Sequence, residues 1–353
     1  MNLLNKTINS IAGQNETVRA QAKERLDQLI MPHWALGQLM DLALDLAGIC
    51  GSIRPSVERK TIVVMAGDHG ITDAGISLFP KEVTVEMVRG FVNGVAGINV
   101  LARQAGADVK VVDMGIAGDL STLAAEGNIL DRKIAPGTNN FAEKPAMSRD
   151  QAVRALEAGI SVAQELADSS DLFGTGDMGI GNTSPSSAIV ATLCQLPIAD
   201  VVGRGTGLDD AQLEHKIDVL EKALSRNNPD PADPIDVISK VGGFEIAGIA
   251  GLVLGAAALK KPIIIDGFIS TAGALLAGRL APKSKEYMIA AHRSVEKGQV
   301  AALADLGKEP LLDLQFRLGE GTGAAVAMNL VEGAVAILTE MATFSEAAVS
   351  EAK

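Results

Sequence analysis

Short apolar runs alternate with longer amphipathic segments along most of the chain. The clearest run, Thr61–Ala66, is continuously apolar and β-branched, and it ends in the segment Gly67–Gly70. Such a run is typical of a buried parallel strand that opens into a functional loop. Further strands are predicted at Val109–Gly115, Leu172–Phe173, Val201–Val202 and Pro262–Gly267.

Helical periodicity fills much of the chain between these runs. Ser148 and Gln151 have the spacing of a capping box, and apolar residues follow them at helical intervals as far as Ala167. Residues 116–147 show little periodicity. Other helices are predicted at residues 15–30, 82–105, 246–259 and 324–346.

This order of elements predicts the fold class. Strands that alternate with helices favour an α/β fold with a mostly parallel, doubly wound, Rossmann-like sheet, whose ligands bind outside the carboxyl ends of the strands. We expect residues 61–323 to form the α/β body. The N-terminal helical segment, residues 1–60, is expected to form a small helical lobe with residues 324–353.

Composition and charge narrow the classes of function. The 353 residues are 47% hydrophobic but only 3% aromatic, so Ala, Val, Ile, Leu and Met must build the core. The formal net charge is -12 and Lys and Arg form no block, which argues against a nucleic-acid partner.

The sequence also predicts a cytoplasmic location and no membrane partner. The N-terminus lacks the basic and apolar regions of a secretory signal. Ile246–Leu259 is uncharged, but it is shorter than the roughly 20 residues that span a bilayer. Cys50 and Cys194 lie far apart and have the character of small buried hydrophobic residues in a reducing compartment.

Three predicted strands lead into loops with glycines at or after the strand end: Gly174–Thr183, Gly203–Asp210, and Phe268–Thr271 after the strand Pro262–Gly267. The first matches the G-x-G-x-x-G pattern of dinucleotide-binding folds, but the acid expected about 20 residues later, Asp200, precedes a predicted strand instead of following one. Backbone N–H groups at a helix start that receive an anion are a second interpretation, and purely structural turns are a third.

The segment Gly67–Gly70 places Asp68 beside His69 at the end of a predicted strand. Such a pair is consistent with acid–base chemistry, with contact to a substrate, or with a hydrogen bond that only fixes the loop. The four histidines show neither HxH nor HxxxH spacing, so no metal site and no metal cofactor are predicted.

Glu320 is the most informative acid, because it stands between glycines in the segment Arg317–Gly323. A carboxylate near apolar surface has a raised pKa and becomes a usable base near neutral pH. An acid that stabilises the start of the following helix is an equally good interpretation of this segment. Basic residues near the glycine segments or helix starts are candidates for a phosphate site: Arg204, Lys216, Arg293 and Arg317.

Several long motifs in the same order make the chain similar to the nicotinate-nucleotide:dimethylbenzimidazole phosphoribosyltransferases of the cobalamin pathway. The resemblance runs through nearly the whole chain. Its motifs are Ala66–Gly70, Pro80–Thr84, Gly176–Thr183, Lys216–Asp218, Val241–Phe244, Asp266–Phe268 and Arg317–Gly323.

The resemblance implies a role for each candidate residue. Glu320 corresponds to the proposed general base, and Asp177 to a second acid that is often glutamate in the family, so a positioning role is expected for the shorter side chain. The implied contacts to substrate and phosphate are Lys216, Ser294, Arg317, Asn182, Thr183, Gly203, Gly205 and Gly176. No cofactor is implied, and the implied partners are nicotinate mononucleotide, a benzimidazole-type base and a second copy in a homodimer.

The pocket for the acceptor base is expected at Phe79, Met87, Leu318 and Asp68. Polar residues occur in other family members where this chain has Phe79 and Met87, so a more apolar pocket is expected. Such a pocket favours dimethylbenzimidazole over adenine or a phenol, or simply tolerates several bases. A nicotinamide-dependent oxidoreductase and a non-catalytic nucleotide or base sensor are the alternative functions.

Overall fold

Six parallel strands form one sheet at the centre of the computed structural model, which describes residues 2–205 and 207–350. The strand order is β3-β2-β1-β4-β5-β6, which is the order of the doubly wound dinucleotide-binding fold, so the predicted fold class is confirmed. The strands are β1 (Lys60–Gly67), β2 (Ala107–Gly115), β3 (Leu130–Asp131), β4 (Leu172–Met178), β5 (Ile263–Ile265) and β6 (Met288–Ala290).

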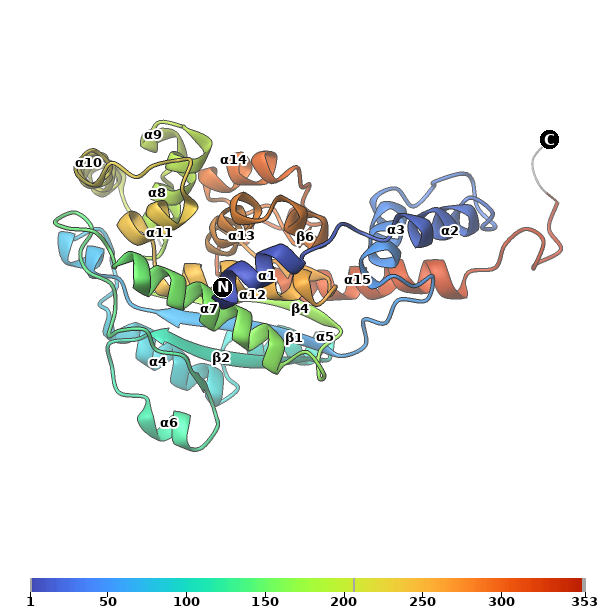
Figure 1. Ribbon diagram of the computed structural model, residues 1–353, viewed down its shortest axis with the longest axis horizontal. Helices are drawn as coiled ribbons and strands as arrows, with labels where there is room; N and C mark the ends of the chain where they lie inside the picture. Colours follow the sequence, from blue (N-terminus) through green and yellow to red (C-terminus); the bar gives the residue numbers. More distant parts are fainter. Residues whose placement is uncertain (1, 206, 351–353) are drawn as a thin grey trace.

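Helices cover both faces of this sheet (Figure 1). They are α1 (Leu3–Ser10), α2 (Glu16–Leu26), α3 (Gln38–Cys50), α4 (Glu82–Val92), α5 (Gly97–Ala105), α6 (Ser121–Ala125), α7 (Arg149–Glu165), α8 (Thr183–Cys194), α9 (Ile198–Val201), α10 (Asp210–Asn227), α11 (Pro234–Val241), α12 (Phe244–Ala258), α13 (Phe268–Leu280), α14 (Lys297–Leu306) and α15 (Thr322–Glu340), with the short 3-10 helices η1 (Gly70–Ala74) and η2 (Pro282–Tyr287).

Strand β1 divides the hydrophobic core into two halves, because successive side chains point to opposite faces of a sheet. Val63 and Met65 pack into the half that α7, α12 and α13 cover. Ile62 and Val64 pack into the other half, which α4, α5 and α15 cover. The expected buried helix at residues 246–259 is confirmed as α12, in which close packing against α7 leaves no room for a side chain at Gly251.

The boundaries of some elements differ from the predictions. Strand β4 runs on through Met178, so Gly174 and Gly176 lie inside a strand and the G-x-G-x-x-G segment is not a dinucleotide loop. The strand expected at Val201–Val202 is wrong, since Val201 ends helix α9, and β6 was not predicted at all. The capping box at Ser148 and Gln151 is confirmed at the start of α7.

Segments from the two ends of the chain pack together at one end of the molecule, where α2 and α3 lie beside the distal half of α15 (Figure 1). Arg25 joins them, since its guanidinium donates to the carbonyl oxygens of Leu338 and Met341. Helix α1 instead packs on α7 and α12 of the body. The division into a lobe of residues 1–60 with 324–353 and a body of 61–323 stays a prediction, and residues 351–353 lie outside the described part.

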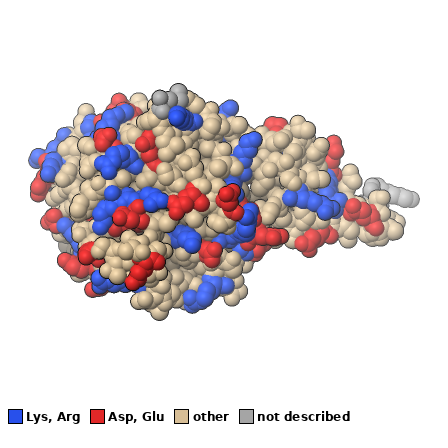
Figure 2. Space-filling model, turned by 60° about the horizontal axis from the view of Figure 1, so that its bottom comes forward, with Lys and Arg blue, Asp and Glu red and all other residues tan. Residues whose placement is uncertain are grey.

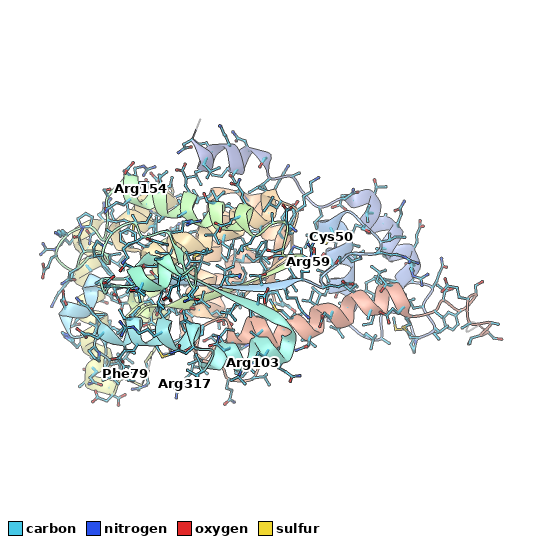
Figure 3. The ribbon with its side chains drawn as sticks, turned by 90° about the horizontal axis from the view of Figure 1, so that it is seen from below. Cys50, Arg59, Phe79, Arg103, Arg154 and Arg317 are labelled. Carbon is cyan, nitrogen blue, oxygen red and sulfur yellow. The ribbon has the colours of Figure 1, made fainter. Side chains whose placement is uncertain are left out.

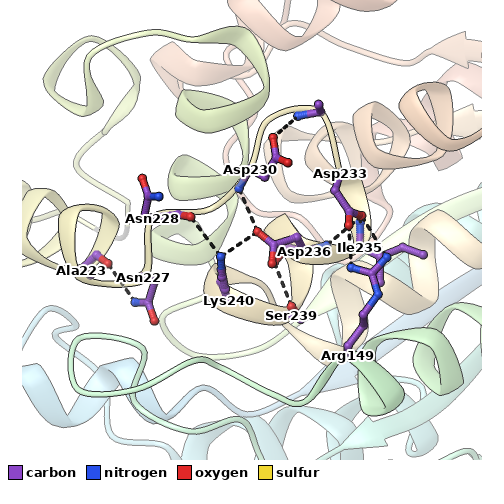
Figure 4. A network of polar contacts seen from close by, with 11 residues as sticks. Arg149, Ala223, Asn227, Asn228, Asp230, Asp233, Ile235, Asp236, Ser239 and Lys240 are labelled. Carbon is purple, nitrogen blue, oxygen red and sulfur yellow. Dashed lines mark hydrogen bonds and ion pairs between the residues drawn. The ribbon is translucent and has the colours of Figure 1, made fainter.

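Polar contacts fix the connection between α10 and α11, and with it the end of the helix that carries Lys216 (Figure 4). Asp233 caps α11 by accepting from the N–H groups of Ile235 and Asp236, and it also pairs with Arg149 at the start of α7. Lys240 of α11 donates to the carbonyl oxygen of Asn228, the C-cap residue of α10, and so holds this end of α10 against α11.

Charges of both signs are interleaved over the surface shown in Figure 2. Among the described residues, one helix, α15, has the length and hydropathy that a membrane-spanning helix needs, and half of it is buried within the protein. It packs on β1, β4 and β5 and on α3 and α5, so its apolar residues have partners in the core.

Candidate active site

A cavity of about 330 Å³ opens at the carboxyl ends of β1 and β4, where the strand order reverses. This is the place where ligands bind in doubly wound sheets. Its lining comes from the segment after η1, from α4, from the turn between β4 and α8, from the loop before α10 and α10 itself, and from the turn before α15. The lining residues are Ile76, Ser77, Phe79, Val83, Met87, Asp177, Met178, Gly179, Ile180, Gly181, Asn182, Thr183, Arg204, Gly205, Leu208, Lys216, Leu318 and Glu320.

Glu320 lies in this cavity in a backbone conformation that is unusual for a residue with a side chain. Its φ is 62°, and Gly319 and Gly321 on either side also have positive φ. Its N–H donates to the carbonyl oxygen of Asp177, and its Oε2 accepts from the N–H of Ile98 at 3.2 Å. A left-handed glutamate costs strain, and such outliers gather at functional sites.

Burial raises the pKa of the Glu320 carboxyl above its ordinary value, because only 4% of the residue is exposed. The N–H of Ile98 acts in the opposite direction, and the negative charge of Asp266 raises the pKa further. A carboxylate in this position therefore takes up a proton more readily than an exposed glutamate.

The glycines of β4 allow the turn of Glu320 to approach the sheet. A Cβ at Gly176 would lie 2.5 Å from the carbonyl oxygen of Glu320, and a Cβ at Gly174 would lie 3.1 Å from Met328 on α15. Gly176 does not line the cavity, so the structure places it differently from the predicted phosphate contact. The close approach of the Glu320 carbonyl oxygen explains why residue 176 is a glycine.

Asp177 faces the cavity from the end of β4 and is 6% exposed. Its Oδ2 accepts from the side-chain amide of Asn182 at 2.9 Å, while its Oδ1 has no hydrogen-bond partner within the described part of the chain. Burial, and after it the negative charge of Asp266, raises the pKa of Asp177 well above its usual range. The protonated form is thus favoured at this position.

Lys216 and Thr183 form the cationic end of the cavity. The ammonium group of Lys216 donates to Thr183 Oγ1 at 2.8 Å, and the Lys216 residue is 1% exposed. Burial lowers its pKa to about 8, and the charge of Glu296 acts against this shift. Thr183 begins α8, whose N-terminus favours an anion, so a phosphate fits between this helix, Lys216 and Gly205.

Much of the remaining lining of the cavity is apolar. Ile76, Val83 and Met87 lie beside Phe79 and Leu318, which are 47% and 60% exposed. Figure 3 shows Phe79 on the same margin of the molecule as Arg317. Half-exposed apolar side chains around a cavity suit a flat aromatic ligand that would cover them.

Other predicted residues lie near the cavity but do not line it. Gly203 and Arg317 line a neighbouring depression of about 350 Å³ that shares Gly205 with the cavity. Ser294 is buried beside this depression, where its N–H donates to Gln299. Asp68 lines a third depression beyond α4, and its Oδ2 accepts from the N–H of Ala117.

His69 lies outside the cavity. Its Nε2 is 2.7 Å from Glu245 Oε1, and both side chains are fully buried. This pair fixes the loop after β1, which is one of the predicted interpretations. No three His, Cys, Asp or Glu side chains gather as a metal site in residues 2–205 and 207–350.

Sequence reasoning missed several residues of the site. Ile76 and Leu208 carry no motif signal beyond an apolar side chain, and Val83 belongs to the motif Pro80–Thr84 but was not singled out. Asp266 lies near the end of the predicted strand Pro262–Gly267 and in the motif Asp266–Phe268, and this position was the signal that could have identified it.

Comparison with known proteins gives a consistent family assignment. A family model described as phosphoribosyltransferase matches residues 11–349. The nicotinate-nucleotide–dimethylbenzimidazole phosphoribosyltransferase of Syntrophotalea carbinolica is 64% identical over 353 residues, which is all of both chains. The corresponding protein of Desulfotalea psychrophila is 55% identical over 351 residues, 99% of each chain.

A solved structure has the same fold. The crystal structure of CobT from Thermus thermophilus superposes with a TM-score of 0.91 at 44% identity, covering 95% of this chain and 100% of that one. The resemblance in the motifs therefore extends over the whole chain and its fold. The chain belongs to the family of nicotinate-nucleotide–dimethylbenzimidazole phosphoribosyltransferases, and the prediction that it is an enzyme of this type is confirmed.

Proposed function

We propose that the protein transfers the 5-phosphoribosyl group of nicotinate mononucleotide to 5,6-dimethylbenzimidazole or a related base, for the nucleotide loop of cobalamin. The products are α-ribazole 5′-phosphate and nicotinate. One observation carries this proposal: Glu320 lines the same cavity as an apolar end and the cationic group Lys216. The cavity can therefore hold a flat base and a phosphate beside a proton acceptor of the protein.

The two substrates differ in what they require. The phosphate of nicotinate mononucleotide is assigned to Lys216, Thr183 and the backbone of Gly205, with Gly203, Ser294 and Arg317 on the far side of that loop. The acceptor base is assigned to Phe79, Met87 and Leu318. Asp68 lines the depression beyond α4 and not the cavity, so its contact with the base stays a prediction.

Nicotinate leaves from a quaternary pyridinium, so its nitrogen needs no proton. The acceptor must lose a proton from its second nitrogen as its first nitrogen attacks the anomeric carbon. Glu320 takes that proton, which its raised pKa favours. Attack opposite the leaving group inverts the β-glycosidic carbon and gives the α-ribotide. Asp177, held by Asn182, positions the reactants.

The apolar lining supports a preference for dimethylbenzimidazole over adenine or a phenol, because Phe79 and Met87 offer no hydrogen bond to a polar ring substituent. We further propose a homodimer in the cytoplasm.

The test is product formation from defined substrates. The protein is incubated with nicotinate mononucleotide and dimethylbenzimidazole, and mass spectrometry follows α-ribazole 5′-phosphate and nicotinate. We expect equimolar products, with slower turnover of adenine and phenol. Base binding without nicotinate release would indicate a sensor, and failure with every base would overturn the proposal.

A further inference from the structure

Asp266 connects the end of β5 to the turn that carries Glu320. It is 1% exposed, its Oδ2 accepts from the N–H of Gly321 at 3.1 Å, and its Oδ1 accepts from the N–H of Ala324 at 3.0 Å. The N-cap residue of α15 is Gly321, which has no side chain to cap the helix. Asp266 therefore caps α15 from a segment more than fifty residues earlier in the chain.

The turn is held from two neighbouring strands. The carbonyl oxygen of Asp177 in β4 accepts from the N–H of Glu320, and the carboxylate of Asp266 after β5 accepts from the next N–H, that of Gly321. These bonds keep Glu320 at its positive φ, a conformation that a non-glycine residue leaves unless its surroundings hold it.

Titratable groups near Glu320 come from the neighbouring strands and from α12. Asp177 comes from β4 and Asp266 from β5, and Glu245 on α12 acts on Asp177. His292 follows β6, with its Nε2 3.7 Å from Asp266 Oδ1. Burial raises the pKa of Asp266 itself, but His292 and the N–H groups of Ala324 and Gly321 favour its carboxylate form, whose charge raises the pKa of Glu320.

We propose that Asp266 is a positioning residue for Glu320: its carboxylate holds the left-handed turn in place and sets the electrostatic environment of the base. The inference rests on the proposed function, because it assigns Asp266 a role through the base. Asp266 does not line the cavity, so it acts without touching the substrate.

The test compares Asp266→Asn, Glu320→Gln and the double variant. Asp266→Asn keeps the shape but loses the charge and one acceptor. We expect kcat to fall by roughly tenfold to a hundredfold, as a misplacement of about 1 Å can cause, with KM for nicotinate mononucleotide changed by less than about threefold. The acid limb of the pH profile should move to lower pH, because removal of a negative charge lowers the pKa of Glu320.

Asp113 provides a matched control. It is a buried carboxylate at the end of β2, it accepts from the N–H groups of Gly115 and Ile116, and it is outside the cavity lining. Asp113→Asn should leave both kcat and the acid limb unchanged. Asp266→Ser serves as a second, smaller variant in case the buried amide prevents folding.

The outcomes separate the inference from the function on which it rests. If Glu320→Gln stays active, the base assignment fails whatever Asp266 does. If Glu320→Gln is inactive but Asp266→Asn keeps its kcat and acid limb, Asp266 has no positioning role. In the double variant, little loss beyond that of Glu320→Gln supports the inference, and multiplied losses contradict it. Unfolding of both Asp266 variants would show a purely structural residue and would also overturn it.

Discussion

The floor and the mouth of the cavity are built in opposite ways. On the floor, Glu320, Asp177 and Lys216 are each 6% exposed or less, and each has a hydrogen-bond partner in the protein. At the mouth, Phe79 and Leu318 are 47% and 60% exposed. Contacts within the protein thus set the ionisation and geometry of the floor. The side chains at the mouth become packed only when a ligand covers them. Substitutions should therefore change the chemistry at the floor and the choice of base at the mouth.

Removal of the base should have the largest effect. Glu320→Gln keeps the shape of the side chain but cannot accept the proton, so kcat should fall by roughly a hundredfold or more. In the unsubstituted protein, kcat/KM should fall with decreasing pH as Glu320 becomes protonated, at a higher pH than an exposed glutamate would give, because burial raises its pKa. Steady-state kinetics across pH measure both effects, and near-normal turnover in a folded variant would remove Glu320 from the mechanism.

Loss of the cation on the floor should weaken phosphate binding next. Lys216→Met should raise KM for nicotinate mononucleotide by roughly tenfold to a hundredfold, since a hydrogen bond to a charged group contributes about 1.5 to 3 kcal/mol. Lys222→Met, on the exposed side of the same helix, is the control and should leave KM unchanged. Equal effects of the two variants would contradict the assigned phosphate site.

The same lysine predicts how stability depends on pH. The pKa of Lys216 is about 8 in the folded protein and 10.5 as its ordinary value, so the unfolded chain binds more protons between these two pH values. The free energy of unfolding gains a contribution that rises with pH through this window, by about 3 kcal/mol at most. Urea denaturation at pH 7.5 and 10 should show this rise relative to Lys216→Met, in which the contribution is absent.

Substitution of Asp177 tests whether the carboxyl groups of Asp177 and Glu320 have the same role in catalysis. Because burial favours its protonated form, the neutral Asp177→Asn should resemble it and lower kcat by only about tenfold, through geometry. The acid limb of the pH profile should persist in this variant. Its disappearance, together with a loss as large as that of Glu320→Gln, would make Asp177 a base instead.

The smallest effects are expected at the mouth. Leu318→Ala should raise KM for dimethylbenzimidazole roughly threefold to tenfold, because a half-buried side chain contributes about 1 kcal/mol, and should leave KM for nicotinate mononucleotide unchanged. Leu314→Ala is a close control, as Leu314 is 51% exposed and does not line the cavity. A loss of kcat in Leu318→Ala would mean that the mouth is not separable from the floor.

Elements with a strong local pattern could be predicted from the sequence. The apolar runs of β1 and β5 and the capping box of α7 depend on neighbouring residues and were identified. Val201–Val202 is too short to distinguish a strand from the end of a helix, and Val201 belongs to α9. The glycines of β4 looked like a loop, because the reason for them is the packing of α15, about 150 residues later in the chain.

The roles of the site residues were likewise predictable only where they depend on neighbouring residues in the sequence. The pattern alone left Glu320 equally an acid at a helix start and a base, and left Lys216 one of four basic candidates for a phosphate site. The family resemblance favoured the base and added Phe79. From the sequence, Asp266 can be recognised only as part of a motif, because its capping of α15 depends on tertiary structure. Gly176 was assigned to phosphate, whereas its position beneath the carbonyl oxygen of Glu320 can be seen only in three dimensions.

Gly319, Glu320 and Gly321 form a short stretch of mirror-image backbone, the hand that D-amino acids prefer. Any L-residue with a side chain introduced at position 319 or 321 adds about 1–2 kcal/mol of strain, and at 321 its Cβ would also meet Ile62 at 2.6 Å. A library made to broaden the choice of acceptor base should therefore keep these two positions fixed. Diversity is better placed at 79, 83, 87 and 318, where changes leave the reactive turn in its native shape.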